Sequence, residues 1–477
     1  MELHISLDGH PTVVGAIYRG VLEAIRDGRI PGGRRLPPTR DLAVNLGVSR
    51  NSVASAYERL TAEGYLEARV GSGTYVRAAP PPRTTVTPRR PVHGLRPLAV
   101  WSRIPAGMPP MGSNPRFDFS VGMPDGELFP LATWRRLLSR ELRVTNLDLG
   151  RYAAPSGVRP LRVAIARHAG ASRAVRAVAD DIIVTNGAQQ ALDLIGRVMV
   201  GPGDVVAVEE PGYPPARRVF ESLGARVIGV GVDGEGLMVD ALPARARLVY
   251  VTPSHQFPLG AVMSLARRRA LLRWAQEAGA TIVEDDYDSE YRYAARPLDP
   301  LQSLDPDGHT VYVGSFSKTL SPALRLGFVV APEALRGPLQ VARSLNDWHG
   351  NPITELALAR FIEDGDLAAH LRRTTRVYAA RRAALLDALS AWPPERLAVI
   401  PSMAGLHVAA RLGAGVDAPT IAARAQAAGI AVRPISHFAA NPATPDGLVL
   451  GFGVIDVERI GPGLQRLARL IDDSVGD

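Results

Sequence analysis

The chain has 477 residues, of which 46% are hydrophobic and none is cysteine. This length predicts at least two domains, and the lack of cysteine excludes disulfides, zinc–thiolate sites and thiol catalysis. The formal net charge of +8 lies entirely before residue 117, where it fits either a nucleic-acid partner or a solvated basic linker. Because the apolar runs are short and no targeting segment is found, we expect an untargeted cytoplasmic protein without a membrane span.

The first expected elements form a helix-turn-helix followed by a wing. Apolar residues at helical spacing predict a helix over Val13 to Arg26. A second, short helix starts near Thr39, its expected N-cap, and Gly47 then turns the chain. Ser49 caps a third helix, and residues 64–76 predict two strands around a glycine-rich tip.

The third helix carries residue types suited to reading DNA. The N-terminal residues of such a helix reach base edges when the helix enters the major groove. Arg50 can bond guanine and Asn51 adenine in bidentate fashion, while Arg40 is placed for a phosphate. The alternative is a small helical dimerisation module with surface arginines.

Residues 80–116 are predicted to be a linker. They contain ten prolines, six arginines and no acidic residue. Proline removes backbone donors and favours extended conformations over packed elements. The expected organisation is therefore a DNA-binding domain over residues 1–79, a semi-rigid linker over residues 80–116, and a large domain over residues 117–477.

Beyond the linker, apolar strand-like runs alternate with long amphipathic stretches, which is typical of a parallel α/β sheet. Several of these runs end in polar clusters. Ligands of open parallel sheets bind outside the carboxyl ends of the strands, so we expect these clusters to share one site. The runs are residues 181–185, 205–208, 248–252, 281–283 and 311–313.

Lys318 is the only lysine in the chain, and the other residues counted as Lys or Arg are all arginine. A Schiff base needs an amine that can lose its proton, and a guanidinium stays charged at any accessible pH. The alternative is a surface lysine that survived by chance. Lys318 is therefore the candidate attachment point of an aldehyde cofactor.

The residues around Lys318 match the needs of a phosphorylated pyridine aldehyde. Arg325 can clamp a phosphate, and Gly187-Ala188-Gln189 opens a helix whose free backbone N–H groups can face an anion. A carboxylate on the strand that ends Glu284-Asp285-Asp286-Tyr287 can keep a ring nitrogen protonated, which makes the ring an electron sink. Asp285 and Tyr287 are expected on one face of their strand.

Two sets of motifs carry a resemblance to known families. The stretches Leu36–Ala43, Gly47–Val53, Glu63–Leu66 and Gly71–Thr74 resemble a GntR-type winged helix over residues 11–77. The resemblance implies that DNA is contacted at five positions, with Arg69 as a weaker candidate. The five positions are Arg40, Ser49, Arg50, Asn51 and Gly71.

The stretches Glu284–Arg292 and Ser315–Gly327 resemble fold-type I aminotransferases. With the winged helix in front, the whole chain is similar to MocR-type transcription regulators. The implied fold is a winged helix-turn-helix plus an α/β domain with a mostly parallel sheet, flanking helices and a smaller C-terminal subdomain. The implied cofactor is pyridoxal 5′-phosphate, the implied assembly is a head-to-tail homodimer, and no metal is expected.

The resemblance also implies roles for individual residues. Lys318 carries the cofactor as a Schiff base, Asp285 pairs with the pyridinium, and Tyr287 pairs with the ring hydroxyl. Tyr213 stacks on the ring, and Tyr152 reaches the phosphate of the partner subunit. The phosphate ligands within the chain are Arg325, Ser315, Ala188 and Gln189.

Two departures from the aminotransferase pattern bear on function. Phe257 stands where an asparagine is usual, with His255 or Gln256 as candidate substitutes. Val449 stands where an arginine usually grips the α-carboxylate of an amino-acid substrate, and a valine cannot do this. Arg433 is either a substitute for that arginine or a structural ion-pair residue.

These departures favour a regulator that senses pyridoxal 5′-phosphate or an amino compound through Lys318 and changes promoter binding. The rival hypothesis is an active aminotransferase with an accessory DNA-binding domain. The regulator predicts salt-sensitive binding to double-stranded operator DNA. The rival predicts rapid turnover of an amino donor with a keto acid.

Overall fold

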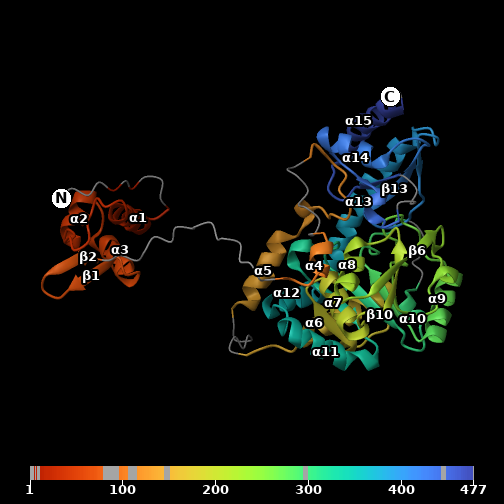
Figure 1. Cartoon of the computed structure of the whole chain (residues 1–477), viewed down its shortest axis with the longest axis horizontal. Helices are drawn as coiled ribbons and strands as arrows, with labels where there is room; N and C mark the ends of the chain where they lie inside the picture. The colour runs from red at the N-terminus through yellow and green to blue at the C-terminus, as the bar shows by residue number, and fades with distance from the viewer. Residues whose placement is uncertain are drawn as a thin grey trace. The chain divides into compact units, whose positions relative to one another are not determined.

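The computed structural model describes Ile5, Leu7 and residues 11–78, 96–105, 115–143, 151–293, 299–441 and 447–475. Contacts between residues divide the chain into two compact units, Met1–Arg96 and Pro97–Asp477. Figure 1 shows the whole chain, and each unit is described by itself.

The N-terminal unit is a winged helix. It consists of α1 (Val13–Arg26), α2 (Thr39–Leu46), α3 (Arg50–Ala62), β1 (Leu66–Arg69) and β2 (Gly73–Val76). The apolar faces predicted from helical spacing pack together, with Ile17, Val53 and Leu60 fully buried. Gly47 adopts a left-handed conformation with φ of 66° and joins α2 to α3, as the helix-turn-helix prediction required.

One predicted cap in this unit is wrong. Thr39 is the first residue of α2, and Pro38 occupies the cap position without a side-chain bond. The ring of proline fixes φ, here at −52°, so the backbone turns into the helix without a capping oxygen. The other predicted cap is confirmed, because Ser49 Oγ accepts from the amide of Ser52 at 3.1 Å.

The wing is confirmed as an antiparallel hairpin. Leu66 lies opposite Val76, and Arg69 lies opposite Gly73. Gly71 is at the tip with φ of +76°, a conformation that residues with a Cβ rarely adopt. The tip is exposed.

The larger unit is built on a mixed sheet that confirms the α/β prediction. Among the described residues the strand order is β4-β11-β10-β9-β8-β5-β6-β7. Neighbouring strands from β10 to β6 are parallel, whereas β11 and β7 run antiparallel to their neighbours. The bounds are β4 Ile182–Thr185, β5 Val205–Glu210, β6 Arg226–Asp233, β7 Gly236–Leu237, β8 Ala246–Val251, β9 Thr281–Asp286, β10 Thr310–Ser315 and β11 Gly327–Val330.

The predicted strand ends all lie at one edge of this sheet. The strands β5, β8, β9 and β10 are mutually parallel, and β4 shares their direction because two antiparallel pairings through β11 separate it from β10. Their carboxyl ends therefore converge. The expectation of one shared site for the polar clusters rests on this topology.

Helices cover the sheet (Figure 1). The apolar side chains of the sheet are buried in clusters with those of the helices. They are α5 (Leu131–Glu141), α6 (Arg159–Arg173), α7 (Ala188–Met199), α8 (Pro214–Ser222), α9 (Leu265–Ala278), α10 (Leu301–Leu304), α11 (Glu333–Asp347) and α12 (Pro352–Glu363). The apolar spacing of α7 places Leu192 and Ile195 against the sheet, where both are fully buried.

The C-terminal subdomain has its own core. A smaller sheet has the order β12-β13-β16-β15 in the described residues, and β3 pairs separately with β14. The bounds are β3 Phe117–Asp118, α13 Asp366–Ser390, β12 Leu397–Val399, β13 His407–Leu412, α14 Ala418–Ala427, β14 Ile430–Ala431, β15 Arg433–Pro434, β16 Gly447–Gly451 and α15 Val457–Val475. None of the described helices is long and apolar enough to cross a membrane.

Part of the segment predicted as linker is helical. The short helix α4 (Val100–Arg103) belongs to the larger unit and contacts α8. The rest of the predicted linker lies largely outside the described residues. Within the predicted linker, the local sequence Val100-Trp101-Ser102-Arg103, which lacks proline, forms a helical turn.

Candidate functional site

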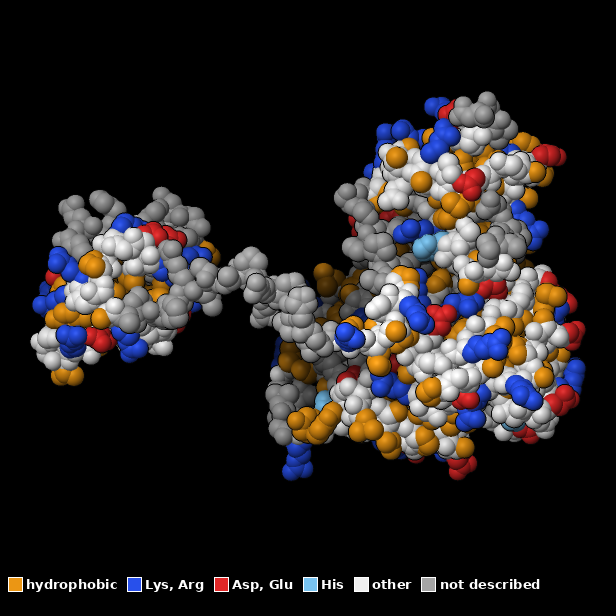
Figure 2. Space-filling view, in the orientation of Figure 1, with side chains coloured by type: hydrophobic (Ala, Val, Ile, Leu, Met, Phe, Trp, Pro, Cys, Tyr) orange, Lys and Arg blue, Asp and Glu red, His pale blue; other side chains and the backbone are white. Residues whose placement is uncertain are grey.

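The winged helix presents its candidate DNA-contacting residues to solvent. Arg50 and Asn51 are the first two residues of α3, and both are exposed, as is Arg40 in α2. The oxygen of Ser49 serves the cap of α3, and it also lies 2.9 Å from Ser52 Oγ. Figure 2 shows basic side chains on the visible face of this unit.

Arg69 is held within the wing. Its Nε donates to Glu67 Oε1 at 3.0 Å, and its guanidinium lies over the ring of Tyr75, 4.7 Å from the ring centroid. These contacts direct the side chain along the hairpin. Arg69 is accordingly less available for DNA than Arg50, which follows the cap directly.

Lys318 follows β10 at the convergent edge of the large sheet and is half-buried. Its amine donates to the carbonyl oxygen of Gly122. A Cβ at Gly122 would lie 3.2 Å from Lys318 Nζ, so glycine at this position leaves room for the amine. Burial lowers the pKa of Lys318, and the carboxylates of Asp288 and Asp285 oppose this shift.

Asp285, on β9, is buried beside this amine. Its Oδ2 accepts from the hydroxyl of Tyr250 at 2.7 Å, and its Oδ1 has no hydrogen-bond partner among the described residues. Burial raises the pKa of Asp285 to about 7, against the opposing effects of Tyr250 and Lys318. The carboxyl group thus has one free oxygen to accept a bond from a ring N–H.

Three of the predicted phosphate ligands lie at the N-terminus of α7: Arg325, Ala188 and Gln189. Arg325 is exposed, adopts a left-handed conformation with φ of 51°, and donates to the carbonyl oxygen of Asn186 at 2.7 Å. Gly187 caps α7 with φ of +81°, and a Cβ there would lie 3.0 Å from Arg325 Nη2. The first amides of the helix, those of Ala188 and Gln189, lack intrahelical acceptors. Ser315, at the end of β10, accepts from the amide of Ser317 at 3.1 Å.

Aromatic side chains form one wall near these groups. The ring centroid of Phe257 lies 5.7 Å from that of Tyr213 and 5.9 Å from that of Tyr287. Tyr287 lies one residue beyond the end of β9, and its hydroxyl donates to the carbonyl oxygen of His255 at 3.0 Å. The hydroxyl also lies 2.9 Å from His255 Nδ1.

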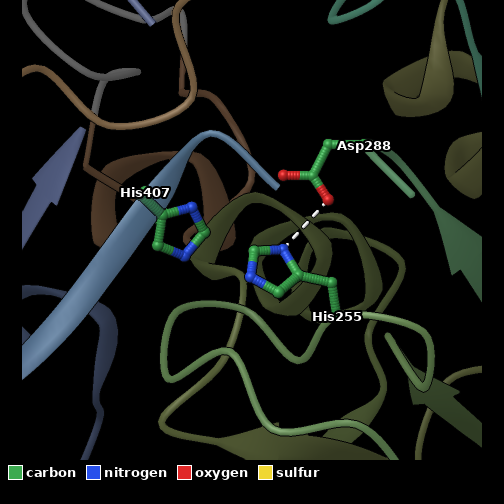
Figure 3. A group of neighbouring side chains, drawn as sticks. All are labelled: His255, Asp288 and His407. Atoms are coloured by element: carbon green, nitrogen blue, oxygen red, sulfur yellow. Dashed lines mark hydrogen bonds and ion pairs between the residues drawn. The ribbon is translucent and has the colours of Figure 1, made fainter. Parts of the chain in front are cut away.

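His255 belongs to a buried polar cluster with Asp288 and His407 (Figure 3). His255 Nδ1 lies 3.0 Å from Asp288 Oδ1, and its Nε2 lies 3.1 Å from Ser402 Oγ. His407 Nε2 lies 3.0 Å from the carbonyl oxygen of Pro258, and burial lowers the pKa of His407 to about 3. Both ring nitrogens of His255 have partners, so the cluster forms a hydrogen-bond network that includes the hydroxyl of Tyr287.

The candidate substitutes for the missing asparagine differ in position. The amide of Gln256 donates to the carbonyl oxygens of Pro211 at 2.9 Å and Phe257 at 2.6 Å, which ties it to the loop. His255 instead reaches Tyr287. Of the two, His255 is the one connected to the candidate ring-hydroxyl partner.

Val449 lies on β16 and is fully buried in an apolar cluster with Ala409, Ile435 and Phe438. Phe257 packs against this cluster. Arg433, on β15, is the register partner of Val449. Position 449, where the resemblance to aminotransferases led us to expect an arginine, therefore lies in an apolar environment.

Among the described residues, the ring contacts of Tyr152 are with Trp348 and His349. It is 74% exposed, and its ring lies 4.3 Å from that of Trp348, centroid to centroid. Trp348 is itself exposed and has φ of 67°. This placement leaves the tyrosine free to meet another molecule.

Several residues of the site were not predicted from the sequence. Tyr250, the partner of Asp285, lies on the neighbouring strand β8, where its apolar surroundings suggested only core. Gly122 precedes the sheet by many residues, and His407 comes from the C-terminal subdomain. The polar cluster at the end of β9 could have identified Asp288, which lies two residues beyond this strand.

Comparisons with known proteins agree with this architecture. Residues 115–447 match the family of aminotransferase class I and II, and residues 14–76 match the gntR family of bacterial regulatory proteins. The chain is 37% identical over 453 residues to the probable rhizopine catabolism regulatory protein MocR of Rhizobium meliloti, covering 94% of this chain and 92% of that protein. It is 33% identical to the pyridoxine biosynthesis transcriptional regulator PdxR of Corynebacterium glutamicum, covering 96% of each.

Among solved structures, the larger unit is similar to the kynurenine aminotransferase of Pyrococcus horikoshii, which was solved in complex with PMP. The TM-score is 0.71 and the identity 30%, over 76% of this chain and 92% of that one. Both units of the chain thus have relatives, and the two relatives named above that match nearly the whole chain are regulators. The chain belongs to the MocR-type transcription regulators, in which a GntR-type DNA-binding domain is joined to a domain of the aminotransferase class I and II family.

Proposed function

We propose that this regulator holds pyridoxal 5′-phosphate on Lys318 and uses it to sense a ligand. The observation that carries the proposal is the free Oδ1 of Asp285, a buried carboxyl oxygen beside the only lysine of the chain. An unpaired buried acceptor is rare in folded proteins and calls for a partner. A protonated ring nitrogen is such a partner.

Each part of the cofactor has a fitting residue. Asp285 would hold the ring nitrogen, and Arg325 with Ser315 and the amides of Ala188 and Gln189 would hold the phosphate. Tyr213 would cover the ring, and Tyr287 would face the ring hydroxyl, with His255 fixing its orientation. When bound, the cofactor supplies an aldehyde that bonds reversibly to amines.

The chain's own residues prepare this attachment. Burial lowers the pKa of Lys318, so that more of the amine is unprotonated and nucleophilic at neutral pH than for an exposed lysine. The Gly122 carbonyl oxygen holds the amine in place. The site so arranged can exchange the lysine for another amine.

The apolar environment of Val449 supports sensing over transamination. A buried valine offers no counter-charge to an α-carboxylate, so an ordinary amino-acid substrate would lose a bidentate contact. Effector candidates are therefore pyridoxal 5′-phosphate itself or an amino compound that displaces Lys318. We further propose a head-to-tail homodimer acting in the cytoplasm, with Tyr152 reaching the phosphate of the partner subunit.

DNA would be bound as promoter half-sites by the winged helices. Arg50 and Asn51 would read bases, with Arg40 on a phosphate and Ser49 and Gly71 near the backbone. The exposure of these residues at the start of α3 and at the wing tip supports this assignment.

The test compares Lys318→Ala with wild type. The expected result is loss of the visible absorbance of the lysine-bound cofactor, with retained binding to operator DNA that no longer responds to the effector. An absorbance band that survives in Lys318→Ala would overturn the cofactor assignment. Failure of wild type to shift any fragment of its genome would overturn the DNA assignment, and rapid multiple turnover with an amino donor would favour an enzyme.

A further inference from the structure

A polar network joins the loop before α7 to the last turn of α11. Asp347, the last residue of α11, accepts through Oδ2 from Asn186 Nδ2 at 2.9 Å and from Gln190 Nε2 at 2.8 Å. The amide of Asn186 donates to Gln190 Oε1 at 2.8 Å, and its carbonyl oxygen accepts from Arg325. One carboxylate on α11 thus holds the loop beside which the phosphate of the cofactor is proposed to bind.

Arg343, on α11, is the fully buried cation of this network. Its Nη1 donates to Asp347 Oδ2 at 2.7 Å and also to Gln190 Oε1. Its Nε and Nη2 have no hydrogen-bond partner among the described residues, and burial lowers its pKa against the opposing charge of Asp347. Burying a guanidinium costs free energy unless its donors are paired, so an arginine is a costly way to fill this space.

The backbone directly after Asp347 is strained. Trp348 has φ of 67° and ψ of −65°, and the amide of His349 donates to the carbonyl oxygen of Asp347 at 2.8 Å. These values describe a rare form of γ-turn, which persists only where the surrounding structure imposes it. The turn places the ring centroid of Trp348 4.3 Å from that of Tyr152, and both side chains are exposed. The side-chain bonds of Asp347 therefore hold the first residue of a turn that sets the position of Trp348.

A second buried carboxylate fixes the loop over residues 152–158. Glu355, on α12, is only 2% exposed, and its Oε2 accepts from the amide of Val158 at 2.8 Å. A Cβ at Gly350 would overlap Glu355 Oε1 and would lie 3.5 Å from Arg343 Nη2. Glu355 thus lies between this loop and the segment after the γ-turn, beside the network around Arg343.

We propose that Asp347 and Arg343 are positioning residues that couple phosphate binding in one subunit to the contact of Tyr152 with the partner subunit. The inference rests on the proposed function and names how the two cofactor sites of the dimer regulate one another. A phosphate beside the start of α7 orders Asn186, whose bond to Asp347 fixes the γ-turn and the ring that faces Tyr152. Coupling of this kind is reciprocal, so a Tyr152 seated in the partner subunit strengthens cofactor binding in its own subunit.

The first experiment compares pyridoxal 5′-phosphate with pyridoxal, which can form the same bond to Lys318 but lacks the phosphate. Both dissociation constants are measured on the full chain freed of cofactor, from the absorbance of the lysine-bound aldehyde. Asn186→Ala removes the side-chain link to Asp347 and leaves the pair of Asp347 with Arg343 intact. We expect it to raise the constant of pyridoxal 5′-phosphate about tenfold, the effect of one hydrogen bond to a charged group, and to leave that of pyridoxal unchanged.

Asp347→Asn removes the charge at the same point and should change the two constants in the same way. Asp193→Asn is the matched control, because Asp193 pairs with Arg197 at 2.7 Å across one turn of α7 and is partly exposed. The control should bind both aldehydes as wild type does. Melting temperature verifies folding, and Asn186→Ala carries the test if Asp347→Asn does not fold.

The second experiment tests the link to Tyr152 by a double-mutant cycle. Tyr152→Phe removes the hydroxyl that is proposed to reach the partner's phosphate, and it should weaken pyridoxal 5′-phosphate by itself. When Tyr152→Phe is combined with Asn186→Ala, the loss of affinity should fall short of the product of the single losses by at least about threefold. Combined with Asp193→Asn, the two effects should simply multiply.

Three results would overturn the inference. An unchanged constant for pyridoxal 5′-phosphate in Asn186→Ala removes the link to the phosphate, equal losses for both aldehydes show a network that only maintains the fold, and multiplying effects in the cycle separate Tyr152 from Asn186. Any of these in protein that shows the lysine-bound absorbance refutes the coupling alone. Absence of that absorbance in wild type, or full affinity in Tyr152→Phe, refutes the proposed function on which the coupling rests.

Discussion

Replacement of Gly187 by alanine should weaken cofactor binding through Arg325. The backbone of Gly187 has φ of +81° and ψ of 174°, a region that residues with a Cβ avoid at a cost of about 1–3 kcal/mol. The new Cβ would also lie 3.0 Å from Arg325 Nη2 and 3.1 Å from Nη1. The guanidinium must then shift by a few tenths of an ångström, away from the proposed phosphate position.

The size of the effect follows from the contact that is disturbed. A hydrogen bond to a charged group contributes roughly 1.5–3 kcal/mol, and each 1.4 kcal/mol changes a dissociation constant tenfold. Disturbing the Arg325 contact should therefore raise the dissociation constant of pyridoxal 5′-phosphate at least about tenfold. Fluorescence titration of the protein freed of cofactor measures this constant.

Gly203→Ala is the matched control. Gly203 also has a positive φ, +88°, but an added Cβ meets nothing within 4 Å. Both variants should lower the melting temperature through backbone strain, and only Gly187→Ala should lower cofactor affinity. Equal affinities in the two variants would refute the view that Gly187 makes room for a phosphate-binding arginine.

Three further predictions concern DNA binding, pH dependence and capping. Arg50→Ala should weaken specific DNA binding by about 1–3 kcal/mol in anisotropy titrations, whereas Arg40→Ala should weaken specific and non-specific DNA alike and reduce the salt slope by about 1; the same profile for both variants would contradict their separate roles. Burial raises the pKa of Asp285 to about 7, so the folded protein without cofactor keeps a proton that the unfolded chain releases near pH 4, and this contribution to stability is lost as pH rises from about 4 to about 7. The unfolding free energy of Asp285→Asn relative to wild type should therefore increase over that interval, and a constant difference would speak against the assignment. Ser49→Ala removes the N-cap hydrogen bond of α3 and should destabilise the winged helix by about 1 kcal/mol in thermal unfolding. A change below about 0.3 kcal/mol would contradict the proposed stabilising effect of this cap.

Local patterns were enough for the winged helix. The spacing of Ile17 and its apolar neighbours, the left-handed Gly47 and the cap at Ser49 are each signals that involve only a few residues close in sequence. Such signals survive without knowledge of the rest of the fold. The cap at Thr39 failed because Pro38 sets the entry to α2 through its own backbone.

The sequence alone also determined which strand ends meet and that Lys318 lies among them, because parallel strands place their carboxyl ends at one edge. It did not determine the partners that complete the site. Tyr250 reaches Asp285 from a neighbouring strand, and Gly122 meets Lys318 across 196 residues of sequence. Only the tertiary structure decided these contacts, and with them the network around Arg343, because side chains from distant segments are brought within bonding distance by packing and not by any local pattern.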